Sequence, residues 1–315
     1  MPDQIPGIHH VTAMAGDAQT NFEFYTDVLG LRLVKRSINQ DDPTTYHLFY
    51  ADGRGSPGTS MTFFPFDNAT QGSVGAGQVG VTAFRVPEGS LDYWADRLDD
   101  HDVTREDPVE RFGERVLPFE DPDGLPLELV EGDDAAEPWT EAVPEEYAVR
   151  GFHGVALLVR DVGPTAELLE TMGYERVDGE ADDDRTRYVS SGDLGAVVDL
   201  IPTQQAGRQG FGTVHHVAFR TPTDEDQQAW RETFADMGFD PTPVIDREWF
   251  HSVYFRGGPR EANTGGVLFE LATHEPGYTV DEPLEELGSS LVLPPKFEDM
   301  RDQIESTLPP LDTDD

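Results

Sequence analysis

The chain has 315 residues and a formal net charge of −40, because 62 acidic side chains stand against only 22 lysines and arginines. That charge disfavours nucleic acid as a partner, and the absence of cysteine excludes disulfides, thiolate catalysis and cysteine-ligated zinc. The acids are spread along the whole chain, a composition typical of proteins from salt-accumulating halophiles. The N-terminus has no basic leader and no apolar run is long enough to span a bilayer, so we expect a cytoplasmic protein without a membrane partner.

A weak internal repeat divides the chain into four copies, each of which reads as a strand, a helix and three further strands. The opening strands and the helices of the copies are predicted at 8–16 and 18–30, 79–87 and 90–103, 151–159 and 164–177, and 214–222 and 226–244. Gly30, Gly173 and Gly238 each follow a helical segment, where a C-terminal glycine is favoured. The repeat is therefore supported by the helix ends as well as by the strands.

An acidic, proline-containing stretch at residues 131–150 separates the second copy from the third and is expected to be a linker. We therefore predict an N-terminal pair of units at 1–135, a C-terminal pair at 150–275 and a C-terminal arm at 276–315. The arm contains one short stretch with apolar residues at helical spacing, which indicates a small amphipathic helix on the surface.

The repeated unit carries "FYTDVLGLRLV" after its first strand and "DPDG" before a closing strand. In these features the chain resembles the vicinal oxygen chelate superfamily, also known as the glyoxalase, bleomycin resistance and extradiol dioxygenase superfamily, over essentially its whole length. The resemblance implies an α+β fold, with four βαβββ units paired into two curved mixed-sheet cups and helices on the convex faces. It also implies that a cup holds a metal, but it does not name the reaction.

Two histidine doublets open the first and fourth copies, in "GIHHVTA" and "TVHHVAF". Neighbouring residues of a strand point to opposite faces, so each doublet can offer one imidazole to a given face. The bulky apolar residues that follow share the parity of His9 and of His215, which places these two histidines under the helices. His10 and His216 are then expected on the open face of the cup.

The closing strand "GGVLFELATH" aims the carboxylate of Glu270 into the same cup, where burial without a partner would cost several kcal/mol. A single strand histidine is more often a packing residue than a ligand, and Glu270 alone could pair with Arg220 or Arg256. The shared parity of His10, His216 and Glu270 at homologous strand positions favours a metal site instead. Two imidazoles and one carboxylate form a facial triad that suits non-haem Fe(II), with Mn(II) as the alternative metal.

The same reasoning predicts that the other cup holds no metal. Glu128 and Asp199 close the second and third copies on the cup-facing parity, but Gly80 and Gly154 stand at the corresponding opening positions. If one ion joins ligands of the first and fourth copies, these copies must be neighbours in the fold although they lie at the two ends of the chain. Packing or solvated positions are expected for the isolated histidines, His47, His101 and His274.

Longer stretches give a closer resemblance. "IHHVT", "YHLFYADGRGSPGTSMTFFPF", "VHHVAF" and the run from "REWFHSVYF" to "GGVLFELATHEPG" are similar, over nearly the full length, to ring-cleaving dioxygenases that act on hydroquinones. The resemblance implies that His10, His216 and Glu270 are the iron ligands. It also implies supporting roles in catalysis for a set of surrounding residues, Tyr254, Arg247, Thr12, His9 and His215. Parity, by contrast, places His9 and His215 off the cup face.

The implied reaction is the opening of a hydroquinone-like aromatic ring by O2 at a non-haem Fe(II) centre. Tyr254 or a histidine would handle a proton, and Arg247 would hold an anionic oxygen. The segment "REWFHS" and the long "GGPREANTGG" connection are expected to shape the substrate pocket. The partners are then a small aromatic substrate and O2, and a homo-oligomer is compatible with the sequence.

Three other functions stay open at this point. They are a catechol extradiol dioxygenase, a glyoxalase-like metal-dependent lyase or isomerase, and a metal-free resistance protein that binds small molecules. The isomerase would need a second cup-facing carboxylate in the closing strand "SMTFFPF", which has none. The metal-free protein would retain no iron.

Overall fold

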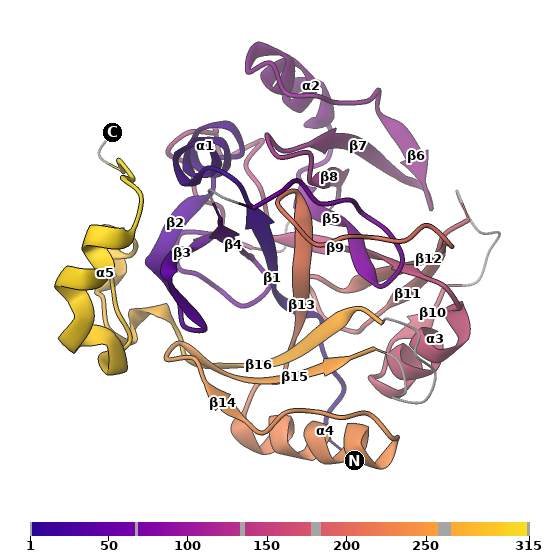
Figure 1. The fold of residues 1–315 in the computed structure, drawn as a ribbon. Coiled ribbons are helices and arrows are strands. Elements are labelled where there is room, and N and C mark those ends of the chain that lie inside the picture. Colours follow the sequence, from indigo (N-terminus) through magenta and orange to yellow (C-terminus); the bar gives the residue numbers. More distant parts are fainter. Residues whose placement is uncertain (1, 67–68, 133–135, 178–183, 258–265, 314–315) are drawn as a thin grey trace.

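The structure is a computed structural model, and it describes residues 2–66, 69–132, 136–177, 184–257 and 266–313. Most of the "GGPREANTGG" connection lies outside these ranges. Within them, the elements follow the predicted order and form an α+β fold of two curved mixed sheets with helices on the outside (Figure 1).

The first sheet joins the units from the two ends of the chain. Its strand order is β14-β15-β16-β13-β1-β4-β3-β2. The strands are Ile245–Asp246, Phe250–Arg256, Leu268–Pro276, Thr213–Arg220, Ile8–Ala15, Ser60–Pro65, Asp42–Ala51 and Arg32–Asn39 in that order. The two units meet through the antiparallel pair of β1 and β13, which run side by side at the centre of Figure 1. The prediction that the first and fourth copies are neighbours is confirmed.

The second sheet repeats this arrangement with the two middle units. Its order is β10-β11-β12-β9-β5-β8-β7-β6, and β5 and β9 form the central antiparallel pair. The strands are Glu175–Arg176, Thr186–Val189, Val197–Pro202, Phe152–Val159, Gln78–Val86, Pro126–Glu131, Glu114–Glu120 and Val109–Arg111 in that order. Each sheet thus takes one unit from each half of the chain.

One helix per unit covers the convex side of a sheet (Figure 1). These helices are α1 (Ala18–Glu23, continued by the π-helical turn η1, Phe24–Val28), α2 (Leu91–Asp100), α3 (Val162–Thr171) and α4 (Asp224–Asp236). Asp17, Asp161 and Thr223 cap three of the N-termini by accepting a backbone N–H. The predicted terminal glycines follow three of the C-termini with φ angles of 69°, 95° and 89°, which glycine adopts without strain.

Apolar side chains of the helices, such as Trp94, Leu168 and Phe234, are buried in one core cluster that runs through both sheets. Burial of this apolar face, more than helix propensity, holds such short helices in place. Among the described residues, no helix combines the length and the apolar character that a bilayer crossing needs.

The C-terminal arm lies along β2 and β3 (Figure 1). It contains η3 (Tyr278–Val280), η4 (Leu284–Glu286), η5 (Pro295–Met300) and α5 (Arg301–Thr307). A helix lies where the amphipathic stretch was expected and buries Ile304, but Met300, which was expected on the same apolar face, ends η5 and is exposed. Tyr278 and Leu287 are also buried in a cluster with Phe49, Trp249 and Phe250, which line the first cup, so the arm packs behind the wall of that cup.

Candidate active site

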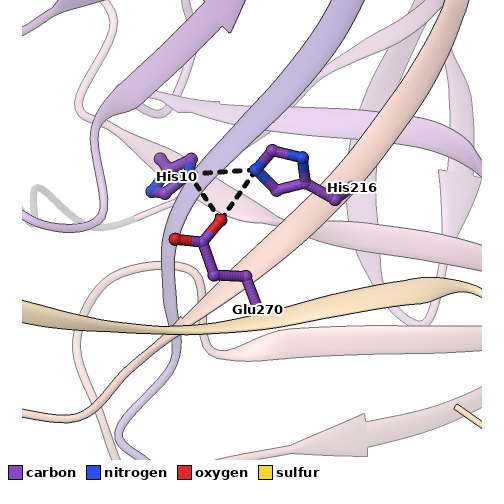
Figure 2. Close-up of side chains that lie close together, drawn as sticks. All are labelled: His10, His216 and Glu270. Atoms are coloured by element: carbon purple, nitrogen blue, oxygen red, sulfur yellow. Dashed lines mark hydrogen bonds and ion pairs between the residues drawn. The ribbon is translucent and has the colours of Figure 1, made fainter. Parts of the chain in front are cut away.

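Three neighbouring strands bring His10, His216 and Glu270 together. His10 lies on β1, His216 lies on the adjacent β13, and Glu270 lies on β16, which pairs with β13 through Ala218. Figure 2 shows the three side chains converging from these strands into one space. The residues that strand parity selected are therefore gathered in one place by the pairing of the first and fourth units.

The three side chains meet through their donor atoms. The Nε2 atoms of His10 and His216 lie 3.3 Å and 2.8 Å from Oε2 of Glu270, and 3.2 Å from each other (Figure 2). All three residues are buried, and Ser252 donates its hydroxyl to the other oxygen, Oε1, at 2.5 Å. Burial by itself opposes ionisation of Glu270, but the contacts with His10 and His216 hold the pKa of this carboxyl well below its usual range.

The donor set fits a metal ion. Ligand atoms about 2.1 Å from an ion and at right angles to one another lie about 3 Å apart, and the three separations given above are close to that value. Among the described residues, Oε2 of Glu270 also has no hydrogen-bond donor in suitable geometry, although it is buried. Within the described part of the chain, His10, His216 and Glu270 are the group of side chains that could hold a metal ion, and their types suit a facial triad with open positions.

Parity predicted that the first histidine of each doublet points to the helix side, but in the structure it does not. Nδ1 of His9 lies 3.0 Å from Nδ1 of His10, and Nδ1 of His215 lies 2.8 Å from Nδ1 of His216. The reason is a β-bulge at each doublet: the register of β1 and β13 skips His9 on one strand and His215 on the other. A bulge inserts one unpaired residue and breaks the alternation of side chains, so the prediction for His9 and His215 was wrong.

The bulges give each metal-ligand candidate a neighbour for its second ring nitrogen. For Nε2 to present a lone pair to an ion, Nδ1 of His10 and His216 must carry the proton and donate it to the preceding histidine. Burial, followed by the nearby His216, lowers the pKa of His215 to about 3, so that its ring is a neutral acceptor. Burial likewise lowers the pKa of His9 well below its ordinary value.

A cavity of about 430 Å³ opens in front of the three side chains. Most of its accessible surface is apolar, and its apolar and aromatic lining residues are Met14, Phe49, Phe64, Phe66, Trp249, Phe250 and Leu268. Its polar lining consists of His10, Asn39, Gln40, Asp41, His47, Gln209, His215, His216, Arg247 and Tyr254. An apolar chamber with a few convergent polar groups is the usual form of a small-molecule site.

Tyr254 and Arg247 stand together on the β15 side of this cavity. The ring of Tyr254 meets that of His216 edge-on at 5.6 Å, and the guanidinium of Arg247 lies 5.5 Å from the Tyr254 ring centre. Arg247 also forms a two-pronged ion pair with Asp41, at 2.9 Å and 3.3 Å. Burial and the charge of Glu270 raise the pKa of Tyr254, so the phenol keeps its proton at neutral pH.

The remaining predicted residues, Thr12 and His9, lie beneath the cavity rather than in its lining. Thr12 is fully buried on β1, and its hydroxyl lies 2.8 Å from the hydroxyl of Thr62 on β4. His9 is buried against Phe250, with a ring separation of 5.3 Å. These two residues therefore support the groups that line the cavity.

His47 is a lining residue that the sequence reasoning missed. It was expected in a packing or solvated position, but it lines the same cavity as His10 and His216. The signal was present in "YHLFYA", because the core residues Tyr46, Leu48 and Tyr50 alternate with His47 and Phe49. Parity applied to this strand would have placed His47 on the cup face.

The cup of the second sheet contains ion pairs at the place where the first cup has His10, His216 and Glu270. By strand register, Glu128 and Gly154 take the places of Glu270 and His10, while a bulge at Gly80 puts Val81, and not Gly80, at the place of His216. The two inward carboxylates are bound to arginines, with Arg185 on Glu128 at 2.9 Å and Arg187 on Asp199 at 2.8 Å. A side chain at Gly154 would also meet the carbonyl oxygen of Val197 at 2.1 Å.

Comparison with known proteins agrees with this fold. The sequence model of the Glyoxalase/Bleomycin resistance protein/Dioxygenase superfamily matches residues 7–129 and 151–271. A Bacillus subtilis protein named "Putative ring-cleaving dioxygenase MhqO" is 46% identical over 99% of this chain and 98% of its own length. The Chlorohydroquinone/hydroquinone 1,2-dioxygenase of Sphingobium indicum is 33% identical over 98% of this chain and 97% of its own length. A crystal structure of a Bacillus subtilis protein superposes with a TM-score of 0.93 at 46% identity, covering 99% of both chains.

Proposed function

Because the chain belongs to the glyoxalase, bleomycin resistance protein and dioxygenase superfamily, we propose that it is a non-haem Fe(II)-dependent dioxygenase that uses O2 to open the ring of a hydroquinone-like aromatic diol. Near-full-length relatives carry the name of ring-cleaving dioxygenases, and the chain is an enzyme of this class. The observation that carries the rest of the proposal is the buried convergence of His10, His216 and Glu270 in the floor of an aromatic cavity.

The triad would hold the iron through two neutral imidazoles and one carboxylate, which suits Fe(II), with Mn(II) as the alternative. Bound there, the ion would supply coordination positions for a phenolic oxygen and for dioxygen, and would allow electrons of the ring to reach the oxygen. His9 and His215 keep the ligand rings in the required tautomer by accepting their Nδ1 protons. Ser252 fixes the orientation of Glu270.

The other residues of the cavity bind the ring and manage its charge. Phe49, Phe64 and Trp249 offer flat apolar surfaces that hold an aromatic substrate and keep water away from it. Tyr254, whose phenol stays protonated, can donate to an oxygen that becomes anionic. The guanidinium of Arg247 supplies positive charge beside it.

Two of the alternatives are disfavoured by the residues of the first cup. A lyase or isomerase of the glyoxalase type would need a second carboxylate facing the cup from β4, and there Thr62 is bonded to Thr12 instead. A metal-free binding protein would have no use for two imidazoles and a carboxylate held with their lone pairs toward one point. A catechol dioxygenase would use the same triad, so only its substrate distinguishes it from the proposed enzyme.

The test compares wild type with Glu270→Ala after anaerobic reconstitution with Fe(II). We expect the wild type to retain iron and to consume O2 with hydroquinone, and Glu270→Ala to lose both, because two neutral imidazoles alone hold the ion weakly. Glu225→Gln, an exposed acid on α4, is the matched control and should behave as wild type. Full iron and full turnover in Glu270→Ala would refute the assignment, and turnover of catechol but not of hydroquinone would favour the catechol enzyme.

A further inference from the structure

His47 stands on the wall of the cavity that β3 and β4 build, across from Tyr254 on β15 and from Arg247, which lies between β14 and β15. Its ring is held between two aromatic neighbours, 3.8 Å from the ring centre of Phe49 and 4.4 Å from that of Phe64. A side chain packed in this way has few rotamers, so its ring nitrogens have fixed positions. Within the proposed function, His47 has no assigned part.

A line of polar groups connects His47 to the strand that carries His10. Nε2 of His47 lies 2.9 Å from the hydroxyl of Thr62, and that hydroxyl lies 2.8 Å from the hydroxyl of Thr12. The register explains the line, because Thr12 and Thr62 are direct partners on β1 and β4, and β3 is the next strand. Both threonines are fully buried, so this is a built connection and not a chance surface contact.

The other ring nitrogen of His47, Nδ1, makes no hydrogen bond to any residue that the structure describes. Burial lowers the pKa of His47 well below its ordinary value, so the ring is neutral, with one nitrogen as donor and the other as acceptor. The threonine hydroxyls can rotate, and Nε2 can therefore either donate to Thr62 or accept from it. Nδ1 can in turn accept from a substrate hydroxyl or donate to a phenolate.

The position of His47 relative to the triad matches one arrangement of substrate oxygens. One strand, β4, separates β3 from β1, so the two backbones are about 10 Å apart at the usual strand spacing. A catechol has both oxygens on the same side of the ring and leaves the far end bare. A hydroquinone has its second oxygen at the far end, where it would meet a group on the opposite wall.

We propose that His47 binds, through Nδ1, the ring hydroxyl that lies opposite the oxygen held at His10, His216 and Glu270, and that it thereby selects para-diols over catechols and monophenols. This inference rests on the proposed function and deepens it, because it assigns the recognition of the second hydroxyl to a named residue. His47 is then a substrate-binding residue, supported from below by Thr62 and Thr12.

Three substitutions separate a direct contact from a structural role. His47→Phe keeps the ring and its packing but removes both nitrogens. His47→Asn can place an amide near the position of Nδ1, whereas His47→Gln can place one near Nε2, toward Thr62. If Nδ1 meets the substrate, His47→Asn should retain much of the function that His47→Gln and His47→Phe lose.

The experiment measures the dissociation constants of hydroquinone and of phenol for the Fe(II)-loaded protein without oxygen, and then kcat/KM for hydroquinone with oxygen. We expect wild type to prefer hydroquinone over phenol, and His47→Phe to lose about 3- to 10-fold of that preference, the value of one hydrogen bond. His101→Phe, an exposed histidine after α2, is the control and should keep the preference. Iron content of each variant shows that the triad is intact.

An unchanged preference for hydroquinone in His47→Phe would overturn the role of His47, as would equal binding of hydroquinone and phenol by the wild type. A greater loss in His47→Asn than in His47→Gln would show that the contact with Thr62 is what matters and would also overturn it. Failure of the proposed function has a different appearance, since the wild type would then consume no O2 with hydroquinone, whether or not it acts on catechol. Both results can be read from the same set of proteins.

Discussion

At the scale of single residues, the site depends on pairs in which one side chain fixes another. Nδ1 of His10 and Nδ1 of His216 each contact Nδ1 of the histidine that precedes them in the sequence. Glu270 is held at Oε1 by the hydroxyl of Ser252. Such outer contacts fix tautomers and ring directions, and their loss weakens metal binding even though no ligand is removed. The importance of these outer contacts can therefore be tested by substituting a residue that holds a ligand but would not touch the metal itself.

Substituting Ser252→Ala removes the hydroxyl that donates to Oε1 of Glu270 at 2.5 Å. We expect the metal to bind about 10- to 100-fold more weakly, because the carboxylate is no longer held in one orientation. The measurement is a competition titration with a chelator of known affinity. Ser37→Ala, whose hydroxyl donates to the carbonyl of Val292 in the arm, is the control, and equal affinities for the two variants would contradict the prediction.

Asp121 provides a pH test away from the cavity. Burial is the main cause that raises the pKa of Asp121 to about 7, above the value of about 4 for an unfolded chain. Between these two values the folded state holds a proton that the unfolded state has lost, so the stability of the wild type should fall as the pH rises from about 4 to about 7. Asp121→Asn keeps an acceptor for the backbone N–H groups of Asp123 and Leu125.

The measurement for Asp121 is urea unfolding of both proteins across this pH range. The free energy of unfolding of Asp121→Asn minus that of the wild type should increase with pH, by an amount on the order of a few kcal/mol. A difference that stays flat across the range would show that the carboxyl of Asp121 titrates normally.

At the scale of secondary-structure elements, the strands that matter most are irregular. Strict alternation correctly put His10, His216 and Glu270 on one face, but it failed for His9 and His215 because both lie at bulges. A bulge depends on the register with the partner strand, and that partner is more than 200 residues away in the sequence. The alternation of a single strand could not reveal it.

The C-terminal arm is attached to the first sheet through a buried lysine. Lys35 on β2 has no exposed surface, and its ammonium meets the carboxylates of Asp281 and Glu282 in the arm. Asp281 also accepts the indole N–H of Trp249 at 2.8 Å, and Trp249 lines the cavity. The chain has only two lysines, Lys35 and Lys296, and the second is an exposed residue bonded to Gln40.

Replacing Lys35→Met leaves two carboxylates without their cation in a buried place. We expect the free energy of unfolding to fall by about 3–5 kcal/mol, the usual cost of breaking a buried ion pair from one side. Lys296→Met is the matched control and should change it by less than about 0.5 kcal/mol. Urea unfolding followed by tryptophan fluorescence measures both, and similar values for the two variants would contradict the role given to Lys35.

At the scale of the whole molecule, the charge of −40 sets the conditions under which the fold is stable. Like charges spread over one surface repel one another, and salt reduces this repulsion by shortening the screening length from about 10 Å at 0.1 M to about 3 Å at 1 M. We expect the free energy of unfolding to rise over this range of KCl. Tetramethylammonium chloride should act similarly if screening is the cause, whereas a rise with KCl alone would indicate specific cation binding.

The whole molecule also decides which units work together. Both sheets pair a unit from one half of the chain with a unit from the other. Only the pair at the chain ends has imidazoles on both central strands, because in the other pair β9 carries His153 but β5 carries no histidine. In the other pair, arginines neutralise Glu128 and Asp199, and Gly154 has no room for a side chain. The same fold therefore builds one chamber with a metal-type site and one filled with ion pairs.

The sequence by itself determined the repeated unit, the helix ends at the glycines and the face on which His10, His216 and Glu270 lie, because each follows from a local period or a local backbone requirement. It also implied the neighbourhood of the first and fourth copies, once one metal was assumed to join their residues. Only the tertiary structure decided the directions of His9 and His215 and the line from Thr12 through Thr62 to His47. These features depend on which strands become neighbours and in which register, and such long-range pairing has no period within a single segment.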